Sequence, residues 1–264
     1  MTFGIDVVVK KINLNADMGE SFGTWKMGDD SSLLKVVCSA NIACGFHAGD
    51  PLHIANTTAL ALEQGVSVGA HPSFSDLQGF GRRQMQLSPQ EFIATVVYQI
   101  GALQAIAISQ GAKLTHVKPH GAMSNMSCAN LEMARQLASA VKLVDINLIL
   151  LAPACSFLSK AGTDLGLSVA LEIFADRAYQ EDGQLVPRSM PNSMIHGPEA
   201  SAQHVIRMLN AGGIISLSGS VLPTSIHSIC VHGDNPQAVE SAKAVKNILI
   251  QNGFTLATLT EMFV

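Results

Sequence analysis

The sequence contains little charge and few aromatic residues. Only 14% of its 264 residues are Asp, Glu, Lys or Arg, only 5% are Phe, Trp or Tyr, and the net charge is −4. No basic run with interleaved aromatics occurs, so nucleic acid is not an expected partner. The most apolar runs, near 93–108 and 148–154, are shorter than a membrane span needs. No basic segment precedes the apolar part of residues 1–10, as a signal sequence would require. We therefore expect a soluble protein that is neither exported nor inserted into a membrane.

Paired cysteines are also missing. The five cysteines are odd in number and include no C-x-x-C pair; they are Cys38, Cys44, Cys128, Cys155 and Cys230. This pattern is typical of reduced thiols in a protein of the cytoplasm. We therefore expect a cytoplasmic protein whose cysteines serve in packing.

The sequence has no phosphate-binding loop of the G-x-x-x-x-G-K-[ST] type. The segment GAK at 111–113 is followed by Leu114, and GFG at 79–81 lacks the third glycine of a dinucleotide fingerprint. Other folds bind ATP without such a loop, so its absence excludes only this manner of nucleotide binding.

Short strand-like runs alternate with longer helical ones, and no linker or change of composition marks a domain boundary. The candidate strands are 11–16, 39–45, 66–71, 113–119, 147–152, 168–175 and 226–232, with a weaker eighth at 214–218. Such alternation is typical of βα units on a parallel sheet. Because α/β barrels of this length commonly form one domain, we expect residues 1–264 to be a single domain.

Six of the candidate strands have one polar face. In THVKPHGA (115–122), His116, Lys118 and His120 alternate with Val117 and Pro119, and a strand points alternate side chains to opposite faces. Parallel strands covered by helices on both faces are instead nearly continuously apolar. A closed barrel with a polar interior explains the pattern. We expect Lys118 and His120 to belong to the site and His116, deeper in the strand, to be structural.

Reactive side chains gather at the expected carboxyl ends of these strands, where the site of such a barrel lies. They are Asp17, His47, His71, His120, Asp176, His232 and Asp234. Four of the nine histidines are among them, although random placement would also spread histidines over helices and loops. We interpret the set as a functional site rather than as separate core histidines.

Seven sequence blocks carry a resemblance to a known family. They are NLNADMGESFG (13–23), NIACGFHAGDP (41–51), GAHPSFSDLQGFGRR (69–83), HVKPHGA (116–122), EIFADRAY (172–179), VPRSMPNSMIH (186–196) and ICVHGDNP (229–236). With these blocks in order, the chain resembles the LamB/YcsF family over essentially its whole length. In one departure, the family usually continues Leu-Tyr-Asn after KPHGA, whereas this chain has Met123-Ser124-Asn125. No role of that tyrosine carries over.

The resemblance implies both a fold and an activity. The implied α/β fold is an irregular, TIM-like (β/α) barrel of seven strands, of the glycoside hydrolase/deacetylase type. The implied activity is ATP-dependent opening of the lactam 5-oxoproline (pyroglutamate) to L-glutamate, together with two companion subunits, B and C. ATP is then used by the assembled complex. Whether the chain also forms a homo-oligomer stays open.

Opening a lactam requires a base for the attacking water, stabilisation of the oxyanion and an acid for the leaving nitrogen. Asp17, or the pair of Glu172 and Asp176, is the candidate base, and Lys118 is the candidate for neutralising the developing charge. The candidates for moving a proton to the nitrogen are His71, His120 and His232. For Asp176 an alternative role is a structural ion pair with Arg177.

The candidates for substrate binding are Asn15, His47, Arg82, Arg188 and Asp234. Arginine binds a carboxylate or a phosphate through a bidentate fork. Arg82 follows the glycine-rich stretch 76–81, and Arg188 lies in a proline-rich stretch that we predict to cover the site. A surface salt bridge is an equal alternative for Arg83, and helix capping is an equal alternative for Asp234.

A second function remains open, from another enzyme class. Asp17, His47 and His71 could hold a divalent metal ion at three strand ends, as in a stand-alone metal-dependent amidohydrolase or carbohydrate deacetylase. Their dispersed positions have no spacing signature that would decide between the two functions. A third alternative, a binding subunit without chemistry, is disfavoured because a scaffold has no need of so many ionisable groups inside a barrel.

Overall fold

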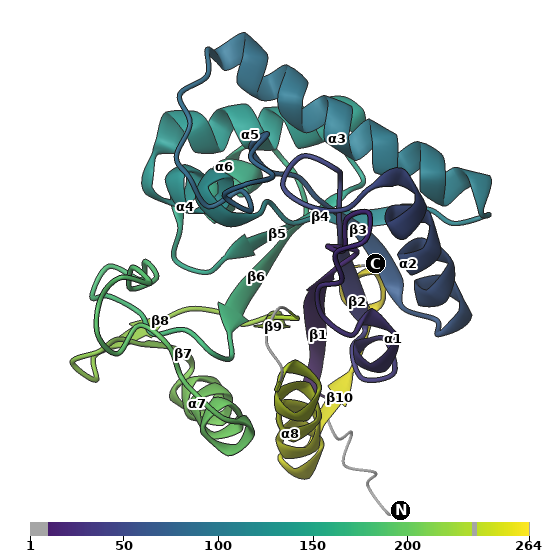
Figure 1. The fold of residues 1–264 in the computed structure, drawn as a ribbon. Coiled ribbons are helices and arrows are strands. Elements are labelled where there is room, and N and C mark those ends of the chain that lie inside the picture. The colour runs from purple at the N-terminus through teal and green to yellow at the C-terminus, as the bar shows by residue number, and fades with distance from the viewer. Residues whose placement is uncertain (1–9, 234–236, 264) are drawn as a thin grey trace, which may run out of the picture.

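The core of the molecule is a closed barrel of parallel strands. The computed structural model describes residues 10–233 and 237–263. The barrel strands are β1 (Lys10–Met18), β2 (Ser39–Ala43), β3 (Ser67–His71), β4 (Leu114–Val117), β5 (Ile149–Pro153), β6 (Val169–Phe174) and β9 (Ser228–Val231). They pair in that order, and β9 also pairs with β1 and closes the ring (Figure 1). Within the described residues, this confirms the predicted seven-stranded, TIM-like (β/α) barrel.

Helices surround the barrel on its outer side (Figure 1). They are α1 (Asp30–Leu33), α2 (Pro51–Glu63), α3 (Pro89–Ser109), α4 (Gly121–Ala129), α5 (Leu131–Val144), α6 (Phe157–Asp164), α7 (Pro198–Ala211) and α8 (Ala238–Gln251). Local sequence explains where several of them begin. Ser88 and Glu91 form a capping box ahead of α3, and Asp50 accepts hydrogen bonds from two backbone N–H groups at the start of α2.

The weak eighth strand lies outside the barrel. Residues Gly213–Ile215 form β7, which pairs antiparallel with β8 (Val221–Pro223) in a separate two-stranded sheet. The sequence analysis also missed β10 (Phe254–Leu256), which pairs with the first residues of β1. Three-residue strands carry too short a pattern to reveal their pairing.

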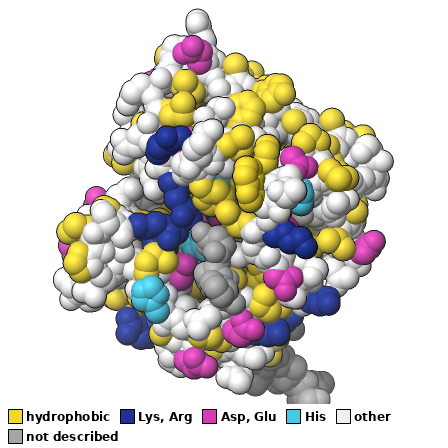
Figure 2. Space-filling view, in the orientation of Figure 1, with side chains coloured by type: hydrophobic (Ala, Val, Ile, Leu, Met, Phe, Trp, Pro, Cys, Tyr) yellow, Lys and Arg dark blue, Asp and Glu magenta, His cyan; other side chains and the backbone are white. Residues whose placement is uncertain are grey.

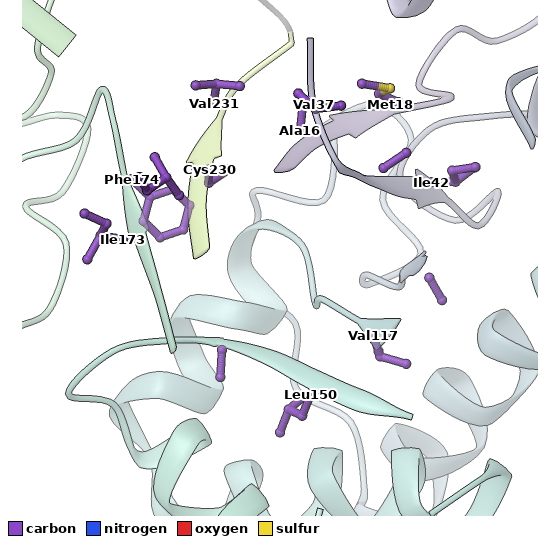
Figure 3. Close-up of a cluster of buried hydrophobic side chains, with 14 of the residues drawn as sticks. Ala16, Met18, Val37, Ile42, Val117, Leu150, Ile173, Phe174, Cys230 and Val231 are labelled. Atoms are coloured by element: carbon purple, nitrogen blue, oxygen red, sulfur yellow. The ribbon is translucent and has the colours of Figure 1, made fainter. Parts of the chain in front are cut away.

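The outer face of the barrel is apolar and packs on the helices. Val117, Leu150 and Ile173 are fully buried and point away from the ring of strands (Figure 3). Over the described residues, α3 is the one helix that is long and apolar enough to cross a membrane by length and composition alone. It contacts α5, α2, β3 and β4, and Phe92 and Ile100 on it are buried, as in a core helix of a barrel.

The amino-terminal end of the barrel is closed by a short helix, α9 (Leu259–Phe263). Leu259 forms a small cluster with Ile149, Leu151 and Ala170 from β5 and β6, and Phe263 packs against it. This plug explains why β5 has no polar face, because its inward side chains meet α9 instead of the polar interior. The opposite end, at the carboxyl ends of the strands, remains for chemistry.

Candidate active site at the carboxyl ends of the strands

The barrel interior is a layered network of polar side chains. Deepest, Asn13 donates to Ser39 Oγ at 2.9 Å and accepts from Ser228 Oγ at 2.7 Å. In the next layer, Asn15 Nδ2 donates to Glu172 Oε1 at 2.8 Å, and Asn41 Nδ2 donates to Asn15 Oδ1 at 2.7 Å. All of these residues are fully buried. The alternating polar rows of the sequence are therefore the inward faces of the strands, and they support the site from below.

His116 belongs to this supporting network. It has no exposed surface, its Nε2 lies 2.9 Å from Asn41 Oδ1 and its Nδ1 lies 2.8 Å from Thr115 Oγ1. Burial, with the charge of Lys118 adding to it, lowers the pKa of His116 to about 3. His116 is therefore a neutral, hydrogen-bonded part of the barrel wall.

Asp17 and Lys118 form a buried ion pair above this network. Lys118 Nζ lies 2.8 Å from Asp17 Oδ1, 2.9 Å from Cys230 Sγ and 3.5 Å from Glu172 Oε1. Burial opposes both charges, but His71 and Lys118 hold the pKa of Asp17 well below its usual range. Asp17, Cys230 and Glu172 likewise hold the pKa of Lys118 well above its usual value. Both groups are therefore charged at neutral pH.

Glu172 has a different environment from Asp17. Burial raises its pKa, only partly offset by Lys118, and Oε2 has no hydrogen-bond partner among the described residues. The pKa values of the two carboxyl groups next to Lys118, those of Asp17 and Glu172, are thus shifted in opposite directions. Such a divergence is a common feature of functional sites.

Three histidines and a glutamate form a second cluster beside Asp17. His71 Nε2 lies 3.3 Å from Asp17 Oδ2 and 3.0 Å from His120 Nδ1. His47 Nε2 lies 3.3 Å from Glu20 Oε1, and the rings of His47 and His120 stack with centroids 4.0 Å apart. The sequence analysis did not select Glu20. Its position three residues after Asp17, in the block NLNADMGE, was the available signal.

His232 is oriented by Asp176. Its Nδ1 lies 2.7 and 2.9 Å from the two carboxylate oxygens of Asp176, and its ring stacks on Phe174 with centroids 5.5 Å apart. Burial opposes ionisation of Asp176, but its interaction with His232 outweighs this effect and lowers the pKa of that carboxyl. The partner of Asp176 is thus a histidine on β9's end rather than Arg177. With Nδ1 bound to the carboxylate, Nε2 of His232 is left for a reacting group.

A cavity of about 680 Å³ lies above these groups. Asp17, His71, Lys118, His120 and His232 line its floor and walls. Three arginines, Arg82, Arg177 and Arg188, line it as well. Basic side chains gather near the centre of this face, with histidine beside them (Figure 2). The arrangement suits an anionic molecule.

Arg177 was missed by the sequence analysis as a site residue. Its Nη2 donates to Val186 O at 2.7 Å, while Nε has no hydrogen-bond partner among the described residues. Burial, and then the charge of Arg188, lowers its pKa to about 10. A bound anion would relieve this repulsion. Arg83, by contrast, is mostly exposed and pairs with Asp76, so the salt-bridge alternative holds for it.

Comparison with known proteins identifies the family. The sequence model of the LamB/YcsF family matches residues 12–264. The chain belongs to the LamB/YcsF family. A relative from Azoarcus sp., named as the A subunit of 5-oxoprolinase, is 56% identical over 252 residues, which are 96% of this chain and 98% of that protein. One with the same name from Coprothermobacter proteolyticus is 52% identical over 95% of this chain and 96% of that protein.

Two solved structures have a similar fold, and the first of them is also similar in sequence. A lactam utilization protein from Thermus thermophilus superposes with a TM-score of 0.88 at 45% identity, over 94% of this chain and 100% of that one. A putative cellobiose-phosphate cleavage protein from Enterococcus faecalis, at 12% identity and a TM-score of 0.57 over 97% and 100% of the two chains, shares the fold alone.

The structure of this LamB/YcsF chain does not place all predicted site residues at the cavity. Asn15 and Glu172 lie beneath its floor, and His47 faces a neighbouring hollow with Glu20 and Trp25. We predicted that Asn15 and His47 bind substrate, but neither lines the cavity. The reason is that Asn15 lies one layer deeper than the strand ends, whereas His47 lies in the loop beyond β2 and turns away. Asp234 lies outside the described residues.

Asp17, His47 and His71, the predicted metal ligands, fall into two separate clusters. Among the described residues, one group able to hold a metal ion comprises Glu20, His47, His71 and His120, and another comprises Asp17, Cys230 and His232. Asp17 therefore belongs to a different group from His47 and His71. Ser124, which stands where the resemblance led us to expect a tyrosine, lines the cavity.

Proposed function

We propose that this chain supplies the hydrolytic site of an ATP-dependent 5-oxoprolinase, in which it opens the lactam of 5-oxoproline to L-glutamate together with two companion subunits, B and C. The observation that carries this proposal is the cavity. Arg82, Arg177 and Arg188, which we call the cationic rim, lie above the charged Asp17–Lys118 pair and the His232–Asp176 pair. The names of the relatives, each the A subunit of 5-oxoprolinase, support this substrate and the presence of companion subunits.

The cationic rim suits a substrate that the companion subunits have already phosphorylated. Water attacks an amide carbonyl only slowly. Phosphorylation of the carbonyl oxygen by the companion subunits, with ATP, would make the ring carbon more electrophilic. Such a molecule carries both a carboxylate and a phosphate. Arg82, Arg177 and Arg188 offer the forked donors that both groups prefer.

The floor of the cavity accounts for the hydrolytic step. His232, held by Asp176, takes a proton from water as its oxygen bonds to the activated carbon. The bond from that carbon to the ring nitrogen then breaks as the nitrogen takes up the proton now held by His232, and the resulting acyl phosphate reacts with a second water to give glutamate and inorganic phosphate. Lys118 stabilises the negative charge on oxygen. The low pKa of Asp17 makes it a weak base, so in this proposal Asp17 positions Lys118 and His71, and His232 takes the role of base that the sequence suggested for Asp17.

The compartment that we propose is the cytoplasm. All five cysteines lie in the described part of the chain and are free, although Cys155 is exposed. Free thiols are typical of that compartment, where ATP is also at hand.

The decisive experiment assays glutamate release and ATP hydrolysis by the purified chain, by the two companions, and by all three together. We expect neither activity at a useful rate from the chain alone, and both from the mixture. Robust lactam opening by the chain alone, with or without ATP, would contradict the proposal and favour a stand-alone amidohydrolase.

A variant then locates the step within the complex. His232→Gln should lower glutamate formation by at least about 100-fold, the usual contribution of an acid–base group, while ADP is still formed from ATP in the presence of 5-oxoproline. His53→Gln, a partly exposed histidine at the start of α2, is the matched control and should keep full activity. Equal loss of both products with His232→Gln would place His232 outside the hydrolytic step.

A further inference from the structure

We propose that Glu20, His47, His71 and His120 bind one divalent transition-metal ion, with Zn²⁺ as the first candidate, and that this ion ties together the loops around the cavity. The four side chains are buried, and their ligand atoms all lie within 4.8 Å of one another. This set differs from the ligands that the sequence suggested, because it contains Glu20 and His120 and omits Asp17.

The close contact between the rings of His71 and His120 cannot be a hydrogen bond if both rings are neutral. His71 Nδ1 lies 2.6 Å from the carbonyl oxygen of Lys118, and His120 Nε2 lies 2.8 Å from the carbonyl oxygen of Phe80. A carbonyl only accepts, so each of these nitrogens carries the hydrogen of its ring. The other two nitrogens, His71 Nε2 and His120 Nδ1, then face each other at 3.0 Å with lone pairs only. The contact therefore needs either an additional proton on His71, whose Nε2 also lies 3.3 Å from Asp17 Oδ2, or a metal ion held by both rings.

Ligand atoms of Glu20 and His47 also lie close to the facing nitrogens of His71 and His120. Glu20 Oε1 lies 3.9 Å from His120 Nδ1 and 3.3 Å from His47 Nε2. Ligands about 2.0–2.1 Å from a tetrahedral zinc ion are about 3.3 Å from one another. The observed separations of 3.0, 3.3 and 3.9 Å bracket that value.

The outer hydrogen bonds are also those of metal-binding histidines. Such histidines donate their second ring N–H to a carbonyl or carboxylate, which sets the tautomer and the direction of the ring. His71 and His120 both do so, through the carbonyls of Lys118 and Phe80. The nitrogens left over are the two that face the cluster.

The chemistry of the set selects the kind of ion and its role. Imidazole suits zinc, iron, nickel or copper, whereas magnesium and calcium prefer oxygen ligands. Four protein ligands fill a tetrahedral shell, which is typical of structural rather than catalytic zinc. His71 is the last residue of β3, and the other three ligands come from the segments after β1, β2 and β4, so one ion would join four consecutive strand ends.

The test measures metal binding without substrate, so its result does not depend on lactam opening. The metal-free chain is titrated with Zn²⁺ in competition with a chromophoric chelator, and with Co²⁺ by visible absorption. We expect one ion per chain, the strong visible bands of tetrahedral Co²⁺ and a higher melting temperature when Zn²⁺ is bound. Binding weaker than that of a surface histidine, or no absorption band, would overturn the proposal and leave a shared proton between His71 and His120.

Variants locate the ligands. His120→Ala and Glu20→Gln should each weaken Zn²⁺ binding by more than about 100-fold, because loss of an outer partner alone costs up to about that much. His53→Ala controls for surface binding and should change nothing. If His120→Ala fails to fold without metal, Glu20→Gln, which keeps shape and volume, decides. Unchanged affinity in Glu20→Gln and in a folded His120→Ala would refute the site.

Discussion

At the scale of single residues, the central feature is a charged pair that is almost closed to solvent. Asp17 and Lys118 neutralise each other in the barrel mouth, and Lys118 also lies near Glu172 and Cys230. Removing one member of a buried pair leaves the other charge uncompensated, which costs far more than removing both. The role of Asp17 in stability can therefore be separated from its role in catalysis.

Asp17→Asn should both inactivate and destabilise. We expect at least about a 100-fold lower rate of glutamate formation in the reconstituted complex, because misplacement of Lys118 and His71 by about 1 Å can cost that much. The free energy of unfolding should fall by about 3–5 kcal/mol, the usual cost of breaking a buried pair. Urea denaturation and the coupled glutamate assay measure the two effects.

The double variant Asp17→Asn/Lys118→Met separates them further. It should regain much of the lost stability, since neither Asp17 nor Lys118 is left as an uncompensated charge, yet remain inactive. A double variant as unstable as Asp17→Asn alone would show that the two charges do not compensate each other in the folded protein.

His116 gives a pH dependence of stability with a definite sign. Its pKa is lowered from 6.5 to about 3 in the folded chain, so between these values the unfolded chain binds the extra proton. Its contribution is therefore lost as the pH falls below 6.5, by about 1.4 kcal/mol per pH unit. His116→Gln should make the unfolding free energy less steep in this range by about one proton. An unchanged slope would mean that other groups dominate.

At the scale of elements, β3 shows how one strand makes room for its neighbour. Gly69 lies opposite His116 of β4, and a Cβ atom built there would overlap the imidazole ring. Gly69 lies in the block GAHPSFSDLQGFGRR (69–83), and the sequence alone gives no reason for a glycine at this position. The reason is the width of His116, which fills the space of both side chains.

Gly69→Ala should therefore lower the free energy of unfolding by about 1–3 kcal/mol, as overpacking of a core does. Gly101→Ala, in α3, is the matched control because nothing lies within 4 Å of a Cβ there. It should be neutral or should stabilise by up to about 1 kcal/mol, since alanine favours helix over glycine. Denaturation of both variants measures the contrast, and equal effects would contradict the packing argument.

At the scale of the whole molecule, closure of the ring joins the two ends of the chain. β1 pairs with β2, with β9 and, at its start, with β10. Early and late segments of the sequence therefore form one sheet, and neither completes the barrel without the other. This is the physical basis for expecting a single domain.

We predict a single unfolding transition. The fluorescence of Trp25, the sole tryptophan, reports on the loop after β1, whereas far-ultraviolet circular dichroism reports on all helices and strands. For one cooperative unit, the two denaturation curves coincide. Separate midpoints would show that the chain contains more than one folding unit.

The sequence by itself determined the barrel class and the polar interior, and it suggested most of the reactive groups that line the cavity. Side chains in a strand alternate between two faces, so Asn13, Asn15 and Asp17 must share one face. A row of polar residues of this kind indicates the inward face wherever the strand lies in the barrel. The βα alternation then allows few arrangements other than a parallel barrel. The blocks that carried the family resemblance contain these same rows.

Only the tertiary structure decided which of these groups meet. Glu20 joins the histidines and Arg177 joins the cationic rim because loops after different strands converge at the barrel mouth, and a period of two says nothing about loops. The charge state of Asp17 likewise depends on Lys118 and His71, from β4's end and β3. Distances between side chains far apart in sequence arise when the ring closes, and local pattern contains no information about them.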